Sequence, residues 1–214
     1  MKSLFVPVKD LRPIKKLLPE TTKLMKGFKS VSITSTVQFN HRVKEVSDYL
    51  TSKGFKTIKY DSVLGCKAIT PKNDCTLIIS NGEFHAINIG LVTGKPVFIL
   101  DPVSGKASKL DESIIKNYQK KQAIRVSKAL YADVIGILVS TKPGQNKLAL
   151  AHSIKQLLES KGKYEVILFL GDELSPGQLN DYPVDAWINT GCPRLIEDDF
   201  EKPIVNWDEI KSYF

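Results

Sequence analysis

Three cysteines, Cys66, Cys75 and Cys192, are the residues of this chain whose types are best suited to chemistry. Cys66 and Cys192 are flanked by turn-forming residues, in G-C-K and G-C-P-R, whereas a structural cysteine is usually packed among aliphatic side chains. The sequence has no C-x-x-C pair, so we expect reduced thiols rather than a disulfide scaffold. Two thiolates do not complete a zinc site or an iron–sulfur cluster. Cys66 and Cys192 are therefore candidate ligands of a metal site that needs further ligands.

Other polar residues could bind an anionic or zwitterionic ligand. The loop T-K-P-G-Q at 141–145 is expected between an apolar strand and a helix, where amide groups at a helix N-terminus favour a carboxylate or phosphate. It lacks the established phosphate-loop spacings, so an ordinary connector remains an alternative. His85 could be a ligand, a hydrogen-bond donor or a packed loop residue, and Arg194 could bind a carboxylate bidentately. His41 and His152 fall in helical patterns, and we expect them on the surface.

An internal repeat predicts the elements that position these residues. Residues 31–60 and 135–169 share one plan, which is an apolar strand, a polar loop, an amphipathic helix, an S-K-G stop and a second strand. Gly54 and Gly162 stand where a helix C-terminus favours a left-handed residue. Two further pairs of apolar strands follow in the same order, D-C-T-L-I-I-S with V-D-A-W-I-N-T and K-P-V-F-I-L-D-P with K-P-I-V-N-W-D-E. Near-continuous apolar strands that alternate with helices indicate parallel sheets flanked by helices.

The predicted fold is α/β, with two similar tandem domains, each a small parallel sheet of about four strands flanked by helices. Domain A is expected over residues 29–110 and domain B over residues 130–214, with a connecting helix at 111–129. Residues 1–28 are interrupted by prolines and read as an N-terminal arm or linker.

The expected sheets indicate which residues can share a site, because ligands of such sheets bind beyond the carboxyl ends of the strands. Cys66 and Cys192 both follow predicted strands, whereas Cys75 opens a strand at its amino end. We therefore predict that Cys66 and Cys192 approach one another across the domain interface and that Cys75 is buried in the first sheet.

Composition is that of an ordinary globular protein, with 42% hydrophobic and 25% charged residues in 214. The net charge of +8 is dispersed, which fits a solvated lysine-rich surface or a face that steers an acidic or RNA-bound partner. No apolar run approaches the ~20 residues that span a bilayer, and the first residues lack a secretory signal. A soluble cytoplasmic protein without a membrane role is expected.

Several motifs together resemble one family, the archaeal-type 2-(3-amino-3-carboxypropyl)histidine synthase of diphthamide biosynthesis. The resemblance spans nearly the whole chain, and that family also has repeated α/β domains. The motifs are V-L-G-C at 63–66, G-E-F-H-A-I-N-I-G-L-V-T-G-K-P-V-F-I-L-D-P at 82–102, G-I-L-V-S-T-K-P-G-Q at 136–145, D-E-L-S-P-G-Q-L at 172–179 and D-A-W-I-N-T-G-C-P-R-L-I-E-D-D at 185–199.

The resemblance implies an activity and a set of site residues. Cys66 and Cys192 would be two of three thiolates that hold a 4Fe–4S cluster, whose fourth iron binds the methionyl part of the substrate S-adenosylmethionine. Iron–sulfur radical chemistry would move its 3-amino-3-carboxypropyl group to a histidine of translation elongation factor 2. Neighbouring residues would bind the rest of the substrate. The amino and carboxylate groups would be held by Ser140, Gly144 and Gln145, charge would be neutralised by His85 and Arg194, and the ribose or amine would be bound by Asp101.

The sequence departs from the family at its start, where the family carries another domain of roughly 100 residues with the first cluster cysteine. We expect a homo- or hetero-oligomer in which a protein supplies this N-terminal domain and the third thiolate, although a fragment of a longer chain would also fit. The chain could instead be a non-catalytic partner or scaffold subunit of the same enzyme. On fold analogy, a nucleotide- or RNA-binding α/β protein is a further hypothesis.

Overall fold

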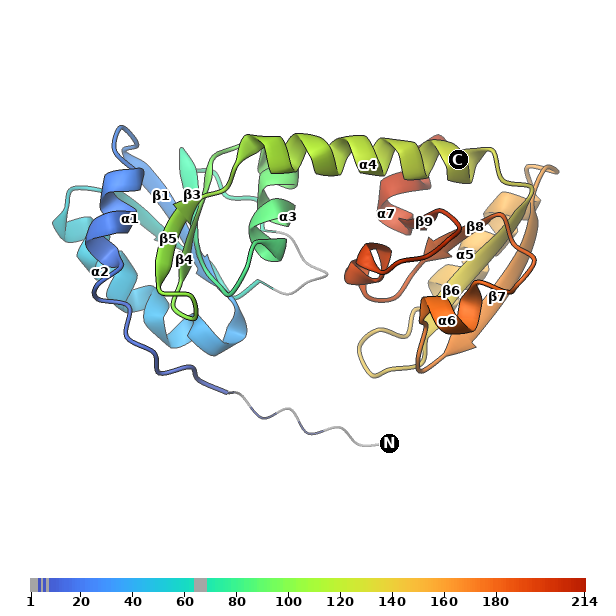
Figure 1. Ribbon diagram of the computed structural model, residues 1–214, viewed down its shortest axis with the longest axis horizontal. Helices are drawn as coiled ribbons and strands as arrows, with labels where there is room; N and C mark the ends of the chain where they lie inside the picture. Colours follow the sequence, from blue (N-terminus) through green and yellow to red (C-terminus); the bar gives the residue numbers. More distant parts are fainter. Residues whose placement is uncertain (1–3, 5, 7, 64–68) are drawn as a thin grey trace. The chain divides into compact units, whose positions relative to one another are not determined.

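The computed structural model describes residues 4, 6, 8–63 and 69–214 (Figure 1). Residues 64–68, which include Cys66, lie outside the described part of the chain. The chain forms two compact units, residues 1–117 and 118–214. Helix α4 (Glu112–Leu130), predicted at 111–129, carries the chain from the first unit into the second. None of the described helices is both long enough and apolar enough to span a bilayer.

The first unit is built on a sheet with strand order β2-β1-β3-β4-β5, in which neighbours are parallel except for the last pair. Its strands are β1 (Ser30–Ser35), β2 (Lys56–Lys59), β3 (Cys75–Ile79), β4 (Val97–Asp101) and β5 (Lys106–Lys109). Its helices are α1 (Leu18–Leu24), the 3-10 helix η1 (Val37–Arg42), α2 (Val43–Ser52) and α3 (Phe84–Thr93).

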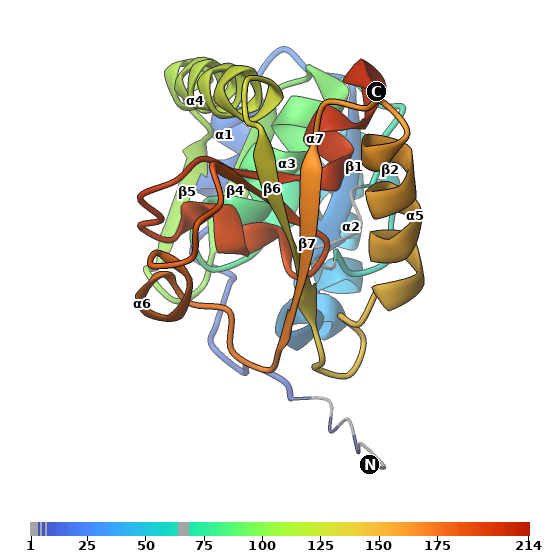
Figure 2. The ribbon, with the colours of Figure 1, turned by 90° about the vertical axis from the view of Figure 1, so that its right-hand side faces the viewer.

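The second unit has a parallel four-stranded sheet with the order β7-β6-β8-β9. Alternate residues of β6 face two cores, so α5 packs with Ile135 and Ile137 on one face while α6 and η2 pack with Leu138 on the other (Figure 2). The strands are β6 (Val134–Ser140), β7 (Glu165–Gly171), β8 (Ala186–Asn189) and β9 (Ile204–Asn206). The helices are α5 (Leu148–Glu159), α6 (Pro176–Leu179), η2 (Pro193–Glu197), α7 (Trp207–Ile210) and η3 (Lys211–Tyr213).

The prediction of two similar α/β domains is confirmed. When the strands are numbered along each unit, both sheets have the second, first, third and fourth strands side by side in that order. The same bonds recur in both units. Asp74 Oδ2 accepts the backbone N–H of Ser30 at 2.9 Å, and Asp185 Oδ2 accepts that of Val134 at 2.8 Å. Each aspartate precedes the third strand of its unit and fastens it to the start of the first strand. The Ser30 amide also lowers the pKa of Asp74.

A second repeated contact involves the lysine that precedes the fourth strand of each unit. Lys95 Nζ donates to the Asn73 carbonyl at 2.7 Å, and Lys202 Nζ donates to the Tyr182 carbonyl. In both units the ammonium group therefore satisfies a carbonyl in the loop before the third strand. Because these lysines open the paired K-P segments of the internal repeat, that part of the repeat reflects a shared structural role.

The first sheet differs from the expected four strands by its fifth strand. A tight turn follows β4, where Asp101 Oδ1 accepts the N–H groups of Val103 at 2.8 Å and Ser104 at 3.2 Å. Gly105 completes the turn at φ 68°, a left-handed value that favours glycine. The returning strand β5 pairs antiparallel with β4. Its sequence K-A-S-K is short and polar, so periodicity alone did not reveal it.

Residues 1–28 also differ from the expected arm, because their second half packs into the first core. Ile14, Leu17, Leu18 and Met25 are buried beside the aliphatic residues of β1 and β3. The spacing of these four residues is helical, and Pro19 lies in the first turn of α1, where proline is tolerated.

Replacing Gly136 by alanine should destabilise the second unit. A Cβ at Gly136 would lie 2.3 Å from Cζ3 of Trp187, which is fully buried and packs edge-on against Phe169. Overpacking of this kind costs about 1–3 kcal/mol. Urea unfolding followed by tryptophan fluorescence measures the effect in this unit alone, because both tryptophans of the chain, Trp187 and Trp207, lie there.

Gly177→Ala is the matched control, because a Cβ at Gly177 would meet no atom within 4 Å. Its unfolding free energy should stay within about 0.5 kcal/mol of wild type. Equal unfolding midpoints for Gly136→Ala and Gly177→Ala would contradict the packing at Gly136.

Candidate functional site

The carboxyl ends of three strands in the second unit meet at one edge of the sheet. Ser140 of β6 is in register with Gly171 of β7, and Leu138 of β6 with Asn189 of β8. Backbone hydrogen bonds extend this edge into the loops, from Thr141 N to Gly171 O at 3.0 Å and from Thr190 N to Leu138 O at 3.1 Å. The loop 141–147 and the loop that carries Cys192 therefore begin side by side.

The Cys192 loop is held by the side chain of Asn189, which is 2% exposed. Asn189 Nδ2 donates to the Cys192 carbonyl at 2.8 Å, and Asn189 Oδ1 accepts the Gly191 N–H at 2.9 Å. The hydroxyl of Thr190 donates to the Leu138 carbonyl at 2.8 Å. These bonds satisfy the turn from inside the protein, while Cys192 itself is only partly buried.

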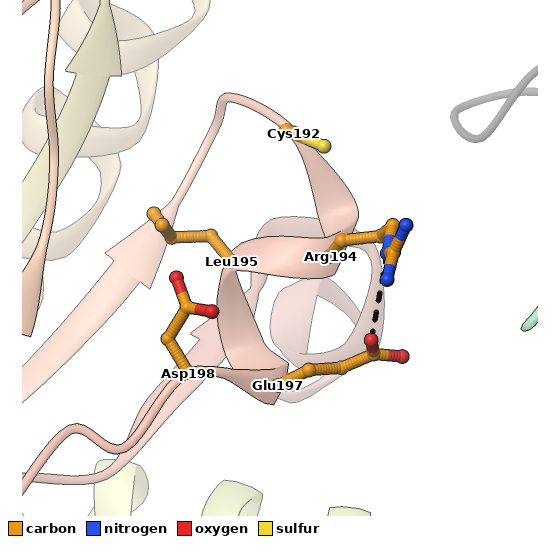
Figure 3. A pocket seen from close by; sticks show the side chains of 5 residues that line it. All are labelled: Cys192, Arg194, Leu195, Glu197 and Asp198. Atoms are coloured by element: carbon orange, nitrogen blue, oxygen red, sulfur yellow. Dashed lines mark ion pairs between the residues drawn. The ribbon is translucent and has the colours of Figure 1, made fainter.

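The Cys192 loop lines a pocket of about 330 Å³, together with residues of η2 (Figure 3). The side chains of Arg194 and Glu197 project to the same side as the Cys192 sulfur, and Arg194 Nε lies 3.5 Å from Glu197 Oε2. This ion pair is solvent-exposed, and such pairs contribute only about 0–1 kcal/mol. The pair with Glu197 therefore contributes little to the stability of this loop. The remaining lining residues are Leu195 and Asp198.

The predicted ligand loop lies next to the Cys192 loop. A Cβ built on Gly191 would lie 3.4 Å from the Cβ of Ser140, so the two loops are in direct contact. Ser140 Oγ accepts the Lys142 N–H at 3.2 Å, and the Gln145 N–H donates to the Lys142 carbonyl at 3.0 Å. Gly144 has φ 79°, which permits this tight turn. The structure thus brings Ser140, Gly144 and Gln145 to the same edge as Cys192.

In the first unit, Cys75 is buried in the sheet, as predicted. It opens β3 with no exposed surface, and burial raises the pKa of its thiol to about 12. Its Sγ lies 3.7 Å from the Ser30 carbonyl. Cys66 lies outside the described residues, so its approach to Cys192 remains a prediction.

His85 and Asp101, the other predicted site residues of the first unit, lie on regular elements. His85 is in the first turn of α3 rather than in a loop, and its ring packs edge-on against Phe84 at 5.1 Å between centroids. Asp101 ends β4, where its Oδ1 supports the turn into β5. The aspartate therefore has a structural role in addition to any role in binding.

His152 is exposed, as expected, whereas His41 is only partly exposed. Both ring nitrogens of His41 are buried and have no hydrogen-bond partner among the described residues. The N-terminal segment lies against the 3-10 helix that carries His41, through bonds from Asp10 N to the Gln38 carbonyl and from Arg42 Nη2 to the Leu11 carbonyl.

The whole chain, residues 1–214, matches the family model described as "Putative diphthamide synthesis protein". The chain belongs to this diphthamide synthesis family. It is 30% identical to the 2-(3-amino-3-carboxypropyl)histidine synthase of Pyrococcus horikoshii, over 98% of this chain and 64% of that protein. It is also 30% identical to the synthase of Methanocaldococcus jannaschii, over 100% of this chain and 62% of that protein.

Solved structures show the same relationship. The crystal structure of Dph2 from Pyrococcus horikoshii matches with a TM-score of 0.85 at 27% identity, over 94% of this chain and 62% of that one. A second structure of Dph2, with a 4Fe–4S cluster, matches with a TM-score of 0.84 at 28% identity and the same coverage. The chain therefore spans less than two thirds of the length of these relatives.

The described residues alone do not form a metal site, because they contain no group of three or more His, Cys, Asp or Glu side chains that could hold an ion. Of the two cysteines in the described part of the chain, Cys192 is the one that is partly exposed. The sequence prediction missed Asn189, which bonds to the backbone of the Cys192 loop. It also missed Asn206, whose Oδ1 accepts a hydrogen bond from Asn189 Nδ2. An asparagine three residues before a cysteine in N-T-G-C was the available signal, because asparagine often bonds to turn backbone.

Proposed function

We propose that this chain is a component of the transferase that moves the 3-amino-3-carboxypropyl group of S-adenosylmethionine to a histidine of translation elongation factor 2. This is the first step of diphthamide biosynthesis and would take place in the cytoplasm. The observation that carries the proposal is the partly exposed Cys192 thiol on a hydrogen-bonded loop at the carboxyl edge of the second sheet. Family membership favours this function over a nucleotide- or RNA-binding one.

The two cysteines seen in the structure differ in how they fit a 4Fe–4S cluster. Cys192 fits, because its thiol borders a pocket and its loop is fixed from within. Cys75 does not fit, because it is fully buried in a central strand and its raised pKa disfavours the thiolate that binds iron. With Cys66 as a second proposed ligand, the third thiolate has to come from outside these 214 residues. We assign it to the N-terminal domain of the family, either on a longer form of this chain or on a protein that assembles with it in a homo- or hetero-oligomer.

When bound, the cluster supplies the electron for radical cleavage of S-adenosylmethionine. Before that cleavage, the residues of this chain bind and orient the methionyl part of the substrate. Ser140, Gly144 and Gln145 lie beside the Cys192 loop and can hold the amino and carboxylate groups, while Arg194 neutralises the carboxylate. His85 of the first unit is proposed to neutralise charge. Asp101 of the first unit is proposed to bind the ribose or amine through Oδ2, because its Oδ1 accepts the N–H groups of the β4–β5 turn.

A second candidate function is that of a non-catalytic partner subunit. It is favoured by similarity to a protein named 2-(3-amino-3-carboxypropyl)histidine synthase subunit 1 from Yarrowia lipolytica, at 28% identity over 87% of this chain and 47% of that protein. Such a name indicates that the relative is one of several subunits. Retention of both Cys66 and Cys192 favours the catalytic component, because a scaffold needs neither thiolate.

This chain alone should not hold an intact, active cluster. Only two cysteines are available for a site that needs three thiolates, and freeing Cys75 would require opening the first sheet, at a cost of several kcal/mol in a fold stabilised by about 5–15. The test is anaerobic reconstitution with iron and sulfide, followed by absorption and spin-resonance spectra and an assay of transfer to elongation factor 2. The cluster should form only with a protein that contributes a third thiolate. Full turnover by the chain alone would refute the proposal.

Arg194→Ala should weaken binding of S-adenosylmethionine to the reconstituted assembly. Loss of a charge-assisted hydrogen bond costs about 1.5–3 kcal/mol, and we expect the lower part of this range because the side chain is exposed. Calorimetry measures the effect. Arg12→Ala is the matched control, because Arg12 is an exposed arginine paired with Asp10 at 3.1 Å in the first unit. An unchanged affinity in Arg194→Ala would exclude this role.

A further inference from the structure

A continuous series of side-chain contacts runs from helix α4 to the Cys192 loop inside the second unit. It begins at Arg125 of α4, whose Nη2 lies 3.9 Å from Glu209 Oε1 and whose guanidinium lies 5.8 Å from the centre of the Tyr118 ring. The side chains of Arg125 and Glu209 are 20% and 11% exposed. At 3.9 Å this ion pair is not a hydrogen bond, and Arg125 Nε and Nη2 have no hydrogen-bond partner among the described residues.

The next step is a reciprocal cap at the start of α7. Glu209 Oε2 accepts the Asn206 N–H at 3.0 Å, and the Asn206 side chain accepts the Glu209 N–H. Burial raises the pKa of Glu209, and the Asn206 amide and Arg125 oppose that shift. One bond of the cap fixes the Asn206 side chain at the end of β9, and the other fixes its backbone.

Asn206 is linked to the Cys192 loop in two ways, through the side chain of Asn189 and directly through its own side chain. Asn206 Oδ1 accepts from Asn189 Nδ2 at 2.7 Å, and Asn206 Nδ2 donates to the Pro193 carbonyl at 3.2 Å. Asn189 in turn binds the Cys192 carbonyl and the Gly191 N–H. The backbone before, at and after Cys192 is therefore fixed by two carboxamides from adjacent parallel strands.

This arrangement requires different chemistry at the two positions. Asn189 must donate, because its Nδ2 faces two acceptors, the Cys192 carbonyl and Asn206 Oδ1. A carboxylate at position 189 would place an oxygen against both of them. At position 206 the accepting Oδ1 makes the short bond, so a carboxylate there keeps that bond and the helix cap. It loses the 3.2 Å bond to Pro193 and sets an oxygen against that one carbonyl.

We propose that Asn189 and Asn206 are positioning residues that fix the backbone of Cys192 and so direct its thiol into the pocket, with Glu209 of α7 holding Asn206 through the helix cap. The reason for such support is that a cluster with thiolates from separate parts of a protein forms only if each ligand is already in place. What the thiol binds rests on the proposed function, whereas the positioning itself does not.

The test measures the alkylation rate of Cys192 in the reduced, cluster-free full-length chain. A short pulse of iodoacetamide is followed by peptide mass spectrometry, which reads Cys192 and Cys66 separately in one sample. Asn206→Leu should raise the rate at Cys192 by about fivefold, the factor expected when the loop loses a hydrogen bond and opens more often. Asn189→Asp should raise it at least as much, and Asn206→Asp, which keeps the bond to Asn189, should raise it less than Asn206→Leu does. The rate at Cys66 should stay constant in all three variants.

Equal rates at Cys192 in wild type and Asn206→Leu would overturn the proposal. A parallel rise in the rate at Cys66 would also overturn it, because that rise indicates general loosening of the fold. If Asn189→Asp does not fold, the two Asn206 variants decide the question alone. A second readout is the spin-resonance spectrum of the cluster reconstituted with the partner, which should change more in Asn206→Leu than in Asn206→Asp. If the wild-type assembly gives no cluster spectrum, the proposed function is wrong. The alkylation rates still test whether Asn189 and Asn206 position Cys192.

Discussion

The buried carboxamide of Asn189 is the contact on which the candidate site depends. A chain that leaves a parallel strand must turn at the carboxyl edge of the sheet, and its backbone groups then lose their ladder partners. Asn189 replaces those partners with one donor and one acceptor, and Asn206 satisfies the next carbonyl. Because this support comes from inside the protein, the outer surface of the loop stays open to the pocket. The nearby Ser140 loop is fixed by the same strand register.

Much of the fold could be predicted from the sequence, because the chain carries the same structural devices twice. The repeated strand order, the left-handed glycines Gly54 and Gly162 and the lysines Lys95 and Lys202 all follow from one duplicated unit. The fifth strand of the first sheet was missed because a short polar strand has no apolar periodicity. Helix α1 was missed because prolines suggested a linker, although the buried residues from Ile14 to Met25 have helical spacing.

The candidate site was less predictable than the fold. Position along a strand was enough to separate the buried Cys75 from the partly exposed Cys192. It could not identify the support of Cys192, because that support joins residues far apart in the chain. Asn189 bonds to Asn206, and Arg125 reaches Glu209 from another helix. Such pairs become visible only when the sheet is assembled. The structure also places His85 on a helix and gives Asp101 a bond to its own turn, details that a motif does not contain.

Iron binding by a matched series of cysteine variants tests most directly whether Cys192 is a cluster ligand. Cys192→Ser, Cys66→Ser and Cys75→Ser should each be reconstituted with ⁵⁷Fe in the presence of the protein that supplies the third thiolate, and their Mössbauer spectra compared. We predict that Cys75→Ser keeps the wild-type 4Fe–4S spectrum, because its thiol is buried away from the site edge. Cys192→Ser and Cys66→Ser should lose it. A wild-type cluster spectrum in Cys192→Ser would contradict the assignment of this thiolate to the cluster.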